Sequence, residues 1–127
     1  MAQKGCILIV EDHPSTINLL SQLVRREGYE PIAARGGEEG LRLLREGGVD
    51  LVLLDLMMDD IDGWTVLKTM KADEALCSIP VIIVTARTEM QEESSISSCD
   101  GLFEAYITKP FSVYELFAKI AQILGER

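Results

Sequence analysis

Short apolar runs alternate with amphipathic segments along the chain. Five apolar runs predict strands, over residues 4–10, 30–34, 50–54, 79–84 and 105–107. Five segments with apolar positions three or four residues apart predict helices, over residues 15–26, 37–45, 63–71, 89–99 and 112–124. This alternation predicts an α/β fold, a doubly wound five-stranded parallel sheet with helices on both faces.

One proline indicates the order of the strands. Pro31 cannot donate a hydrogen bond to a neighbouring strand, so the strand over residues 30–34 belongs at an edge of the sheet. With right-handed crossovers this favours the order 2-1-3-4-5, in which the winding reverses between the first and third strands. Ligands of such sheets bind outside the carboxyl ends of the strands, next to that reversal.

Polar residues stand where the predicted strands end. Glu11 and Asp12 end the first strand, Asp55 ends the third, Thr85 ends the fourth, and Lys109 follows the fifth. The carboxyl ends of parallel strands meet at one edge of the sheet. We therefore expect an acidic pocket that also contains one hydroxyl group and one lysine.

Such a pocket favours a divalent metal and phosphoryl chemistry. Converging carboxylates repel one another, and a bound cation relieves the repulsion. The available ligands are oxygens, from Asp12, Asp55 and nearby carbonyls, with Glu11 reachable through water, which suits Mg²⁺. The single histidine, His13, is no transition-metal site, and we interpret it as a loop residue.

Asp55 can also act as a nucleophile that accepts a phosphoryl group. That transfer requires neutralisation of charge, which Mg²⁺ and Lys109 would supply. A cis peptide between Lys109 and Pro110 would point the ammonium into the pocket. Thr85 could bind a phosphoryl oxygen, and Tyr106 on the adjacent strand is the candidate for a side chain coupled to it in a switch.

Composition excludes several classes of function. A chain of 127 residues fits a single domain over residues 1–127, and 47% hydrophobic residues exclude a disordered chain. The net charge of −9, from 21 acidic and 12 basic residues, makes direct binding to nucleic acid or an anionic membrane unfavourable.

Cysteine usage and the absence of targeting signals predict a cytoplasmic protein. Cys6, Cys77 and Cys99 are too scattered for a zinc site or a disulfide framework, which indicates a reducing compartment. The sequence contains no signal peptide and no apolar run of transmembrane length.

Taken together, the motifs resemble the receiver domain of two-component response regulators, the CheY-like family. The resemblance is carried by ILIVED at 7–12, LVLLDLMM at 51–58, the Asp62-Gly63 pair, VIIVTA at 81–86 and AYITKPF at 105–111. It covers essentially the whole chain, and five motifs in register are far more specific than any one of them. The fold it implies is the flavodoxin-like three-layer sandwich with strand order 2-1-3-4-5.

The resemblance implies roles for the acidic residues. Asp55 would be the phosphoacceptor, and Glu11 and Asp12 would hold Mg²⁺. The backbone carbonyl of Met57 would complete the protein ligands of the metal, together with Asp55 itself.

It implies roles for the other pocket residues as well. Lys109 and Thr85 would contact the phosphoryl group, and Tyr106 would turn inward when Thr85 moves. Met57 and Arg87 would flank the pocket and tune how long the phosphate survives.

The chain departs from the family pattern in two places. Asp59 replaces the usual proline after the phosphoacceptor, and with Asp60 and Asp62 it makes this loop unusually acidic, which could alter partner choice or loop stiffness. The segment over residues 99–104 also differs, and the span from Thr85 to Lys109 is slightly long. The fourth helix and the loop after it are therefore the part that the resemblance describes least.

We expect a phosphoacceptor signalling module rather than an enzyme with turnover. Its phosphoryl donor would be a phosphohistidine on a sensor histidine kinase or histidine phosphotransfer protein, and its output a changed surface for a downstream effector protein or domain. A monomer or a weak, phosphorylation-dependent dimer fits this role, in a stand-alone protein or a domain of a larger regulator.

Two alternatives come from other classes of protein. A Mg²⁺-dependent phosphohydrolase with a nucleophilic aspartate usually has a second aspartate two residues later, where this chain has Met57. A pseudo-receiver or flavin-type binding module would not require the complete set of pocket residues.

Overall fold

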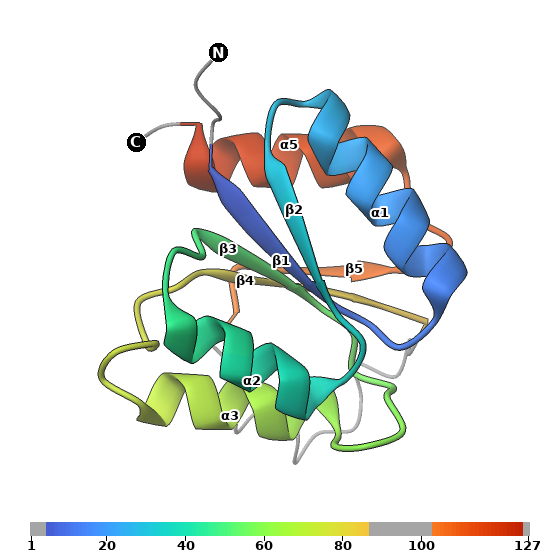
Figure 1. Cartoon of the computed structure of the whole chain (residues 1–127). Helices are drawn as coiled ribbons and strands as arrows, with labels where there is room; N and C mark the ends of the chain where they lie inside the picture. The colour runs from blue at the N-terminus through green and yellow to red at the C-terminus, as the bar shows by residue number, and fades with distance from the viewer. Residues whose placement is uncertain (1–4, 87–102, 126–127) are drawn as a thin grey trace.

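Strands and helices alternate along the chain in the computed structural model, which describes residues 5–86 and 103–125 (Figure 1). The elements in chain order are β1 (Cys6–Val10), α1 (Pro14–Arg26), β2 (Glu30–Ala34), α2 (Gly37–Glu46), β3 (Leu51–Leu54), α3 (Gly63–Ala72), β4 (Val81–Thr85), β5 (Ala105–Thr108) and α5 (Val113–Leu124). Nine of the ten predicted elements are confirmed to within two residues at each end. The predicted helix over residues 89–99 and the site residue Arg87 lie outside the described residues.

The five strands form one parallel sheet in the predicted order, β2-β1-β3-β4-β5. Pro31 lies on the edge strand β2, opposite Ile7 of β1, as its missing N–H requires. The fourth strand starts two residues later than predicted, at Val81. Its first amide donates to the side chain of Glu104 at 2.7 Å, and Pro80 just before it has no N–H to donate.

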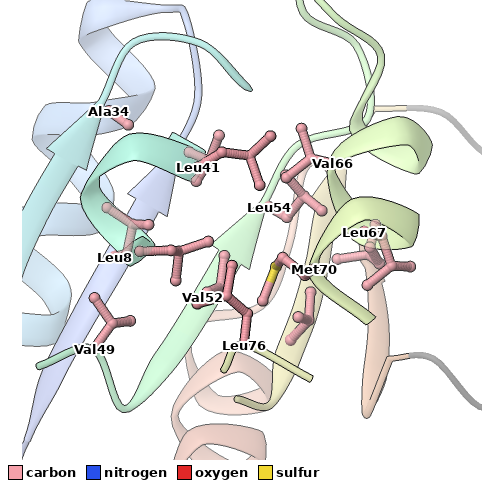
Figure 2. Close-up of a cluster of buried hydrophobic side chains, with 14 of the residues drawn as sticks. Leu8, Ala34, Leu41, Val49, Val52, Leu54, Val66, Leu67, Met70 and Leu76 are labelled. Atoms are coloured by element: carbon pink, nitrogen blue, oxygen red, sulfur yellow. The ribbon is translucent and has the colours of Figure 1, made fainter. Parts of the chain in front are cut away.

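Helices cover both faces of the sheet, with α1 and α5 on one face and α2 and α3 on the other (Figure 1). The strands are buried on both sides, so consecutive residues of one strand belong to different cores. Leu8 of β1 and Val52 of β3 face α2 and α3, whereas Ile7 and Ile9 face α1 and α5. Figure 2 shows the first of these cores, where side chains of α2 and α3 meet those of the central strands.

The register of the sheet aligns the polar ends of the strands. Val10 pairs with Leu54, so Glu11 and Asp55 are the next residues of two adjacent strands. Thr85 pairs with Thr108, and the amide of Lys109 donates to the carbonyl of Thr85 at 2.8 Å. In the part of the chain that the structure describes, no helix has the length and apolar character to cross a membrane.

Gly63 lets α3 begin directly against the end of β3. A Cβ at this position would lie 2.4 Å from the carbonyl oxygen of Asp55 and 2.6 Å from the Cα of Leu56, both backbone atoms. The amide of Gly63 also donates to the carbonyl of Leu56 at 3.1 Å. The loop between β3 and α3 is therefore closed tightly beside Asp55.

We predict that Gly63→Ala lowers the free energy of unfolding by about 2 kcal/mol, because the new methyl group overlaps backbone that cannot yield without moving Asp55. Thr65→Ala is the control, since Thr65 is exposed in the first turn of the same helix and its loss should cost less than about 0.5 kcal/mol. Urea unfolding of both variants checks this, and equal stability of the two would contradict it.

Candidate functional site

The ends of β1 and β3 bring three carboxylates and one imidazole together. Ligand atoms from Glu11, Asp12, His13 and Asp55 all lie within 4.8 Å of one another. Glu11 and Asp55 are almost completely buried, with 1% and 3% of their surface exposed. Buried carboxylates are costly unless partners compensate their charge, so their contacts decide what the site can do.

Lys109 reaches this cluster from the end of β5. Its Nζ lies 2.7 Å from Oε1 of Glu11 and 3.8 Å from Oδ2 of Asp55. The Lys109–Pro110 peptide is cis, as the sequence suggested. The ammonium therefore pairs closely with Glu11 and lies within ion-pair distance of Asp55.

His13 takes part in the cluster, which the sequence interpretation missed. Its ring Nδ1 lies 2.9 Å from Oε2 of Glu11 and 3.2 Å from Oδ1 of Asp12, while 69% of the side chain is exposed. Its backbone N–H also donates to Oε2 of Glu11, at 3.1 Å. The available signal was its position directly after the acidic pair, where a short turn folds the ring back.

The two carboxylate oxygens of Asp12 have different surroundings. Oδ2 accepts the amide of Asp59 at 3.0 Å. Oδ1 is buried and accepts no hydrogen bond from the described residues, although the His13 ring is near it. Buried polar atoms are rarely left in this condition, and each exception calls for an explanation, such as a bound ion, a water molecule or a catalytic role.

The pKa of Asp55 is raised above its ordinary value. Burial is the main cause and the Glu11 carboxylate adds to it, while hydrogen bonds from the Thr85 hydroxyl and the Met57 amide oppose both. The nearby Lys109 ammonium also favours the ionised form, without restoring the ordinary pKa. An ionised Asp55 is thus under-compensated by the protein alone.

The pKa values of the neighbours of Asp55 shift in other ways. Burial raises the pKa of Glu11, but hydrogen bonds from Lys109 and His13 outweigh it, and the net shift is downward. The hydrogen bond to Glu11, with the charges of Glu11 and Asp12, raises the pKa of His13. Glu11 is therefore held as an anion between the Lys109 ammonium and the His13 ring.

The site fits a hard divalent cation such as Mg²⁺. The carboxylate donors are oxygens, Oδ1 of Asp12 accepts no hydrogen bond from the described part of the chain, and Asp55 lacks full compensation of its charge. A cation beside Asp12 and Asp55 would satisfy both. The predicted roles of Glu11, through water, and of the Met57 carbonyl stay predictions. Met57 is exposed, at 54% of its surface.

Tyr106 belongs to an aromatic cluster on the α3 side of the sheet. Its ring centroid lies 6.5 Å from that of Trp64 and 5.9 Å from that of Phe103, and these two are 6.1 Å apart. Tyr106 is half-buried on β5, opposite Ile83 of β4. The sequence assigned no role to Trp64, because the contact arises only when β5 joins the sheet next to β4.

Comparison with known proteins identifies the family. The family of the response regulator receiver domain matches residues 7–121. The chain belongs to this family. The chain is 41% identical to the polar-differentiation response regulator DivK of Brucella ovis, over 94% of this chain and 96% of that protein.

Solved receiver domains share the fold. The response regulator TrrA of Thermotoga maritima, crystallised in complex with Mg(2+)-BeF, is 31% identical with a TM-score of 0.83, over 94% of this chain and 99% of that one. The receiver domain of a signal transduction histidine kinase from Syntrophus aciditrophicus is 30% identical with a TM-score of 0.86, over 96% and 91%. The predicted family and fold are confirmed. Receiver domains are signalling modules that in general bind Mg²⁺ and interact with histidine kinases and effectors.

We predict that Asp55→Asn stabilises the metal-free receiver domain at pH 7 by about 1 kcal/mol, because it removes a buried charge that the protein under-compensates. A raised pKa means that the folded wild type loses stability as pH rises above 3.8, the ordinary pKa of the group. The stability that Asp55→Asn gains over the wild type should therefore vanish below about pH 3.8. Urea unfolding in EDTA at pH 3.5 and 7 measures it, and a less stable variant at pH 7 would contradict the prediction.

Proposed function

We propose that this receiver domain is the phosphoacceptor of a two-component or phosphorelay system and that Asp55 is the residue that receives the phosphoryl group. The convergence at one sheet edge of Asp55, Lys109 and the buried Asp12 oxygen that accepts no hydrogen bond from the described residues carries this proposal. The donor would be a phosphohistidine on a sensor histidine kinase or a histidine phosphotransfer protein.

The chemistry follows from the position of Asp55. A carboxylate oxygen attacks the phosphorus of the phosphohistidine, the P–N bond breaks as the new P–O bond forms, and the imidazole leaves and takes up a proton. Lys109 holds a positive charge beside the accepting carboxylate. Asp12, Asp55, the Met57 carbonyl and, through water, Glu11 would hold Mg²⁺. When bound, Mg²⁺ would neutralise charge on the phosphoryl oxygens.

Thr85 is poised to report the modification. Its hydroxyl now hydrogen-bonds Asp55, and a phosphoryl group there would offer a stronger acceptor. We expect the hydroxyl to turn toward the phosphoryl oxygen and Tyr106 to turn inward with it, which changes a surface read by an effector protein or domain. Met57 and Arg87 would tune the lifetime of the phosphate.

The whole chain, residues 1–127, would act as one receiver domain through protein contacts, as a monomer or a weak dimer, without binding nucleic acid or membrane directly. The free thiols of Cys6 and Cys77 support a reducing compartment, and we propose a cytoplasmic location. Apart from assisting its own phosphorylation and dephosphorylation, it would catalyse no turnover. Phosphohydrolases with a nucleophilic aspartate usually have a second aspartate where this chain has Met57.

Phosphorylation by acetyl phosphate tests the proposal. We predict that the wild type gains one acid-labile phosphoryl group in Mg²⁺ and none in EDTA, and that Asp55→Asn gains none. Asp59→Asn is the matched control, because Asp59 is an exposed acid of the same loop, and it should be labelled like the wild type. Intact-protein mass spectrometry reads the outcome.

Equal labelling of Asp55→Asn would contradict the proposal. Steady hydrolysis of a simple phosphate ester by the wild type would instead favour the hydrolase alternative. Failure to bind Mg²⁺ or a beryllofluoride mimic of the phosphoryl group would favour a binding module that is never phosphorylated.

A further inference from the structure

The acidic loop after β3 is attached to the start of α2. The carboxylate of Asp60 accepts hydrogen bonds from the amides of Gly37 and Glu38, both at 3.0 Å. These are the first two residues of α2, whose N-cap residue, Gly36, has no side chain to accept them. Asp60 therefore caps this helix from another loop, where its charge also suits the helix dipole.

Two glycines at the start of α2 leave space for this contact. A Cβ on Gly36 would lie 2.7 Å from Oδ2 of Asp60, and a Cβ on Gly37 would lie 2.4 Å from Cγ1 of Ile61. Gly36 has an extended backbone that any residue adopts, with φ of −177°, so space rather than conformation explains the glycine. The absence of a side chain at both glycines lets the loop after β3 pack against the start of α2.

The residue before Asp60 continues the connection into the site. The amide of Asp59 donates to Oδ2 of Asp12, at 3.0 Å. This hydrogen bond engages Oδ2 of Asp12, while the buried Oδ1 lies 3.2 Å from Nδ1 of His13 and accepts no hydrogen bond from any residue that the structure describes. Asp59 and Asp60 thus connect the start of α2 to Asp12, a proposed metal ligand.

We propose that Asp60 is a positioning residue for the divalent cation: by fixing the loop on α2 it holds the Asp59 amide on Asp12 and so orients the oxygen that the cation needs. The inference rests on the proposed metal site and adds to it a residue that does not touch the metal. Partners that orient metal ligands typically account for about ten-fold to 100-fold in affinity.

Asp60→Ala should weaken Mg²⁺ binding about tenfold, the lower end of that range because Asp60 acts through Asp59. Asp73→Ala is the matched control. The Asp73 carboxylate accepts the amide of Ala75 at 2.8 Å, just beyond the end of α3 that is away from the site. This control also loses a carboxylate that accepts a backbone amide, yet its Mg²⁺ affinity should stay within about twofold of the wild type. Amide chemical shifts followed during a MgCl₂ titration give both dissociation constants.

Two further measurements separate positioning from charge and from folding. In the metal-free protein, the amides of Glu38 and Asp59 should exchange hydrogen faster in Asp60→Ala, with no such change in Asp73→Ala. Gly36→Ala keeps the charge of Asp60 but displaces its carboxylate, so it should also weaken Mg²⁺ binding. Combined with Asp60→Ala, it should add little further loss, because both changes break one contact.

The outcomes distinguish the two proposals. A wild type that binds no Mg²⁺ overturns the metal site and this inference with it. A wild type that binds Mg²⁺ while Asp60→Ala binds it equally well overturns only the role of Asp60. Unchanged affinity in Gly36→Ala would show that the charge of Asp60 acts alone and would likewise overturn positioning.

Discussion

The ion pair between Glu11 and Lys109 is the interaction on which the site depends. It joins the end of β1 to the residue after β5, 98 positions apart in sequence, at 2.7 Å. With His13 on its other oxygen, Glu11 stays ionised despite burial. Of the two buried acids in the described residues, Asp55 is the one whose charge is compensated less. That imbalance makes Asp55 receptive to a cation.

The parallel sheet creates this arrangement before any side chain takes part. The pairing of Val10 with Leu54 sets two buried acids side by side, and the approach of α3 at Gly63 closes the loop beside them. The same loop is fixed on α2 through Asp60, so the layer of helices on one face also supports the site. The same contacts therefore stabilise the fold and position the acidic residues of the site.

The strand order and the position of the buried acids could be predicted from the sequence, because apolar runs indicate buried strands and Pro31 indicates an edge strand. Contacts between loops did not follow. Asp60 binds an amide 23 positions away, and no local pattern distinguishes it from a solvated acid. Trp64 meets Tyr106 only after β5 has joined the sheet. His13 is mostly exposed, and its role depends on the turn that returns its ring to Glu11.

The dependence of folding stability on Mg²⁺ tests most directly whether the acidic cluster is a cation site. Urea unfolding at pH 7 should show the wild type gaining about 1.4 kcal/mol for each tenfold rise in Mg²⁺ above the dissociation constant. Asp12→Asn should gain far less under the same conditions. NaCl at matched ionic strength controls for screening of charge. A wild type no more stable in Mg²⁺ than in NaCl would contradict the account.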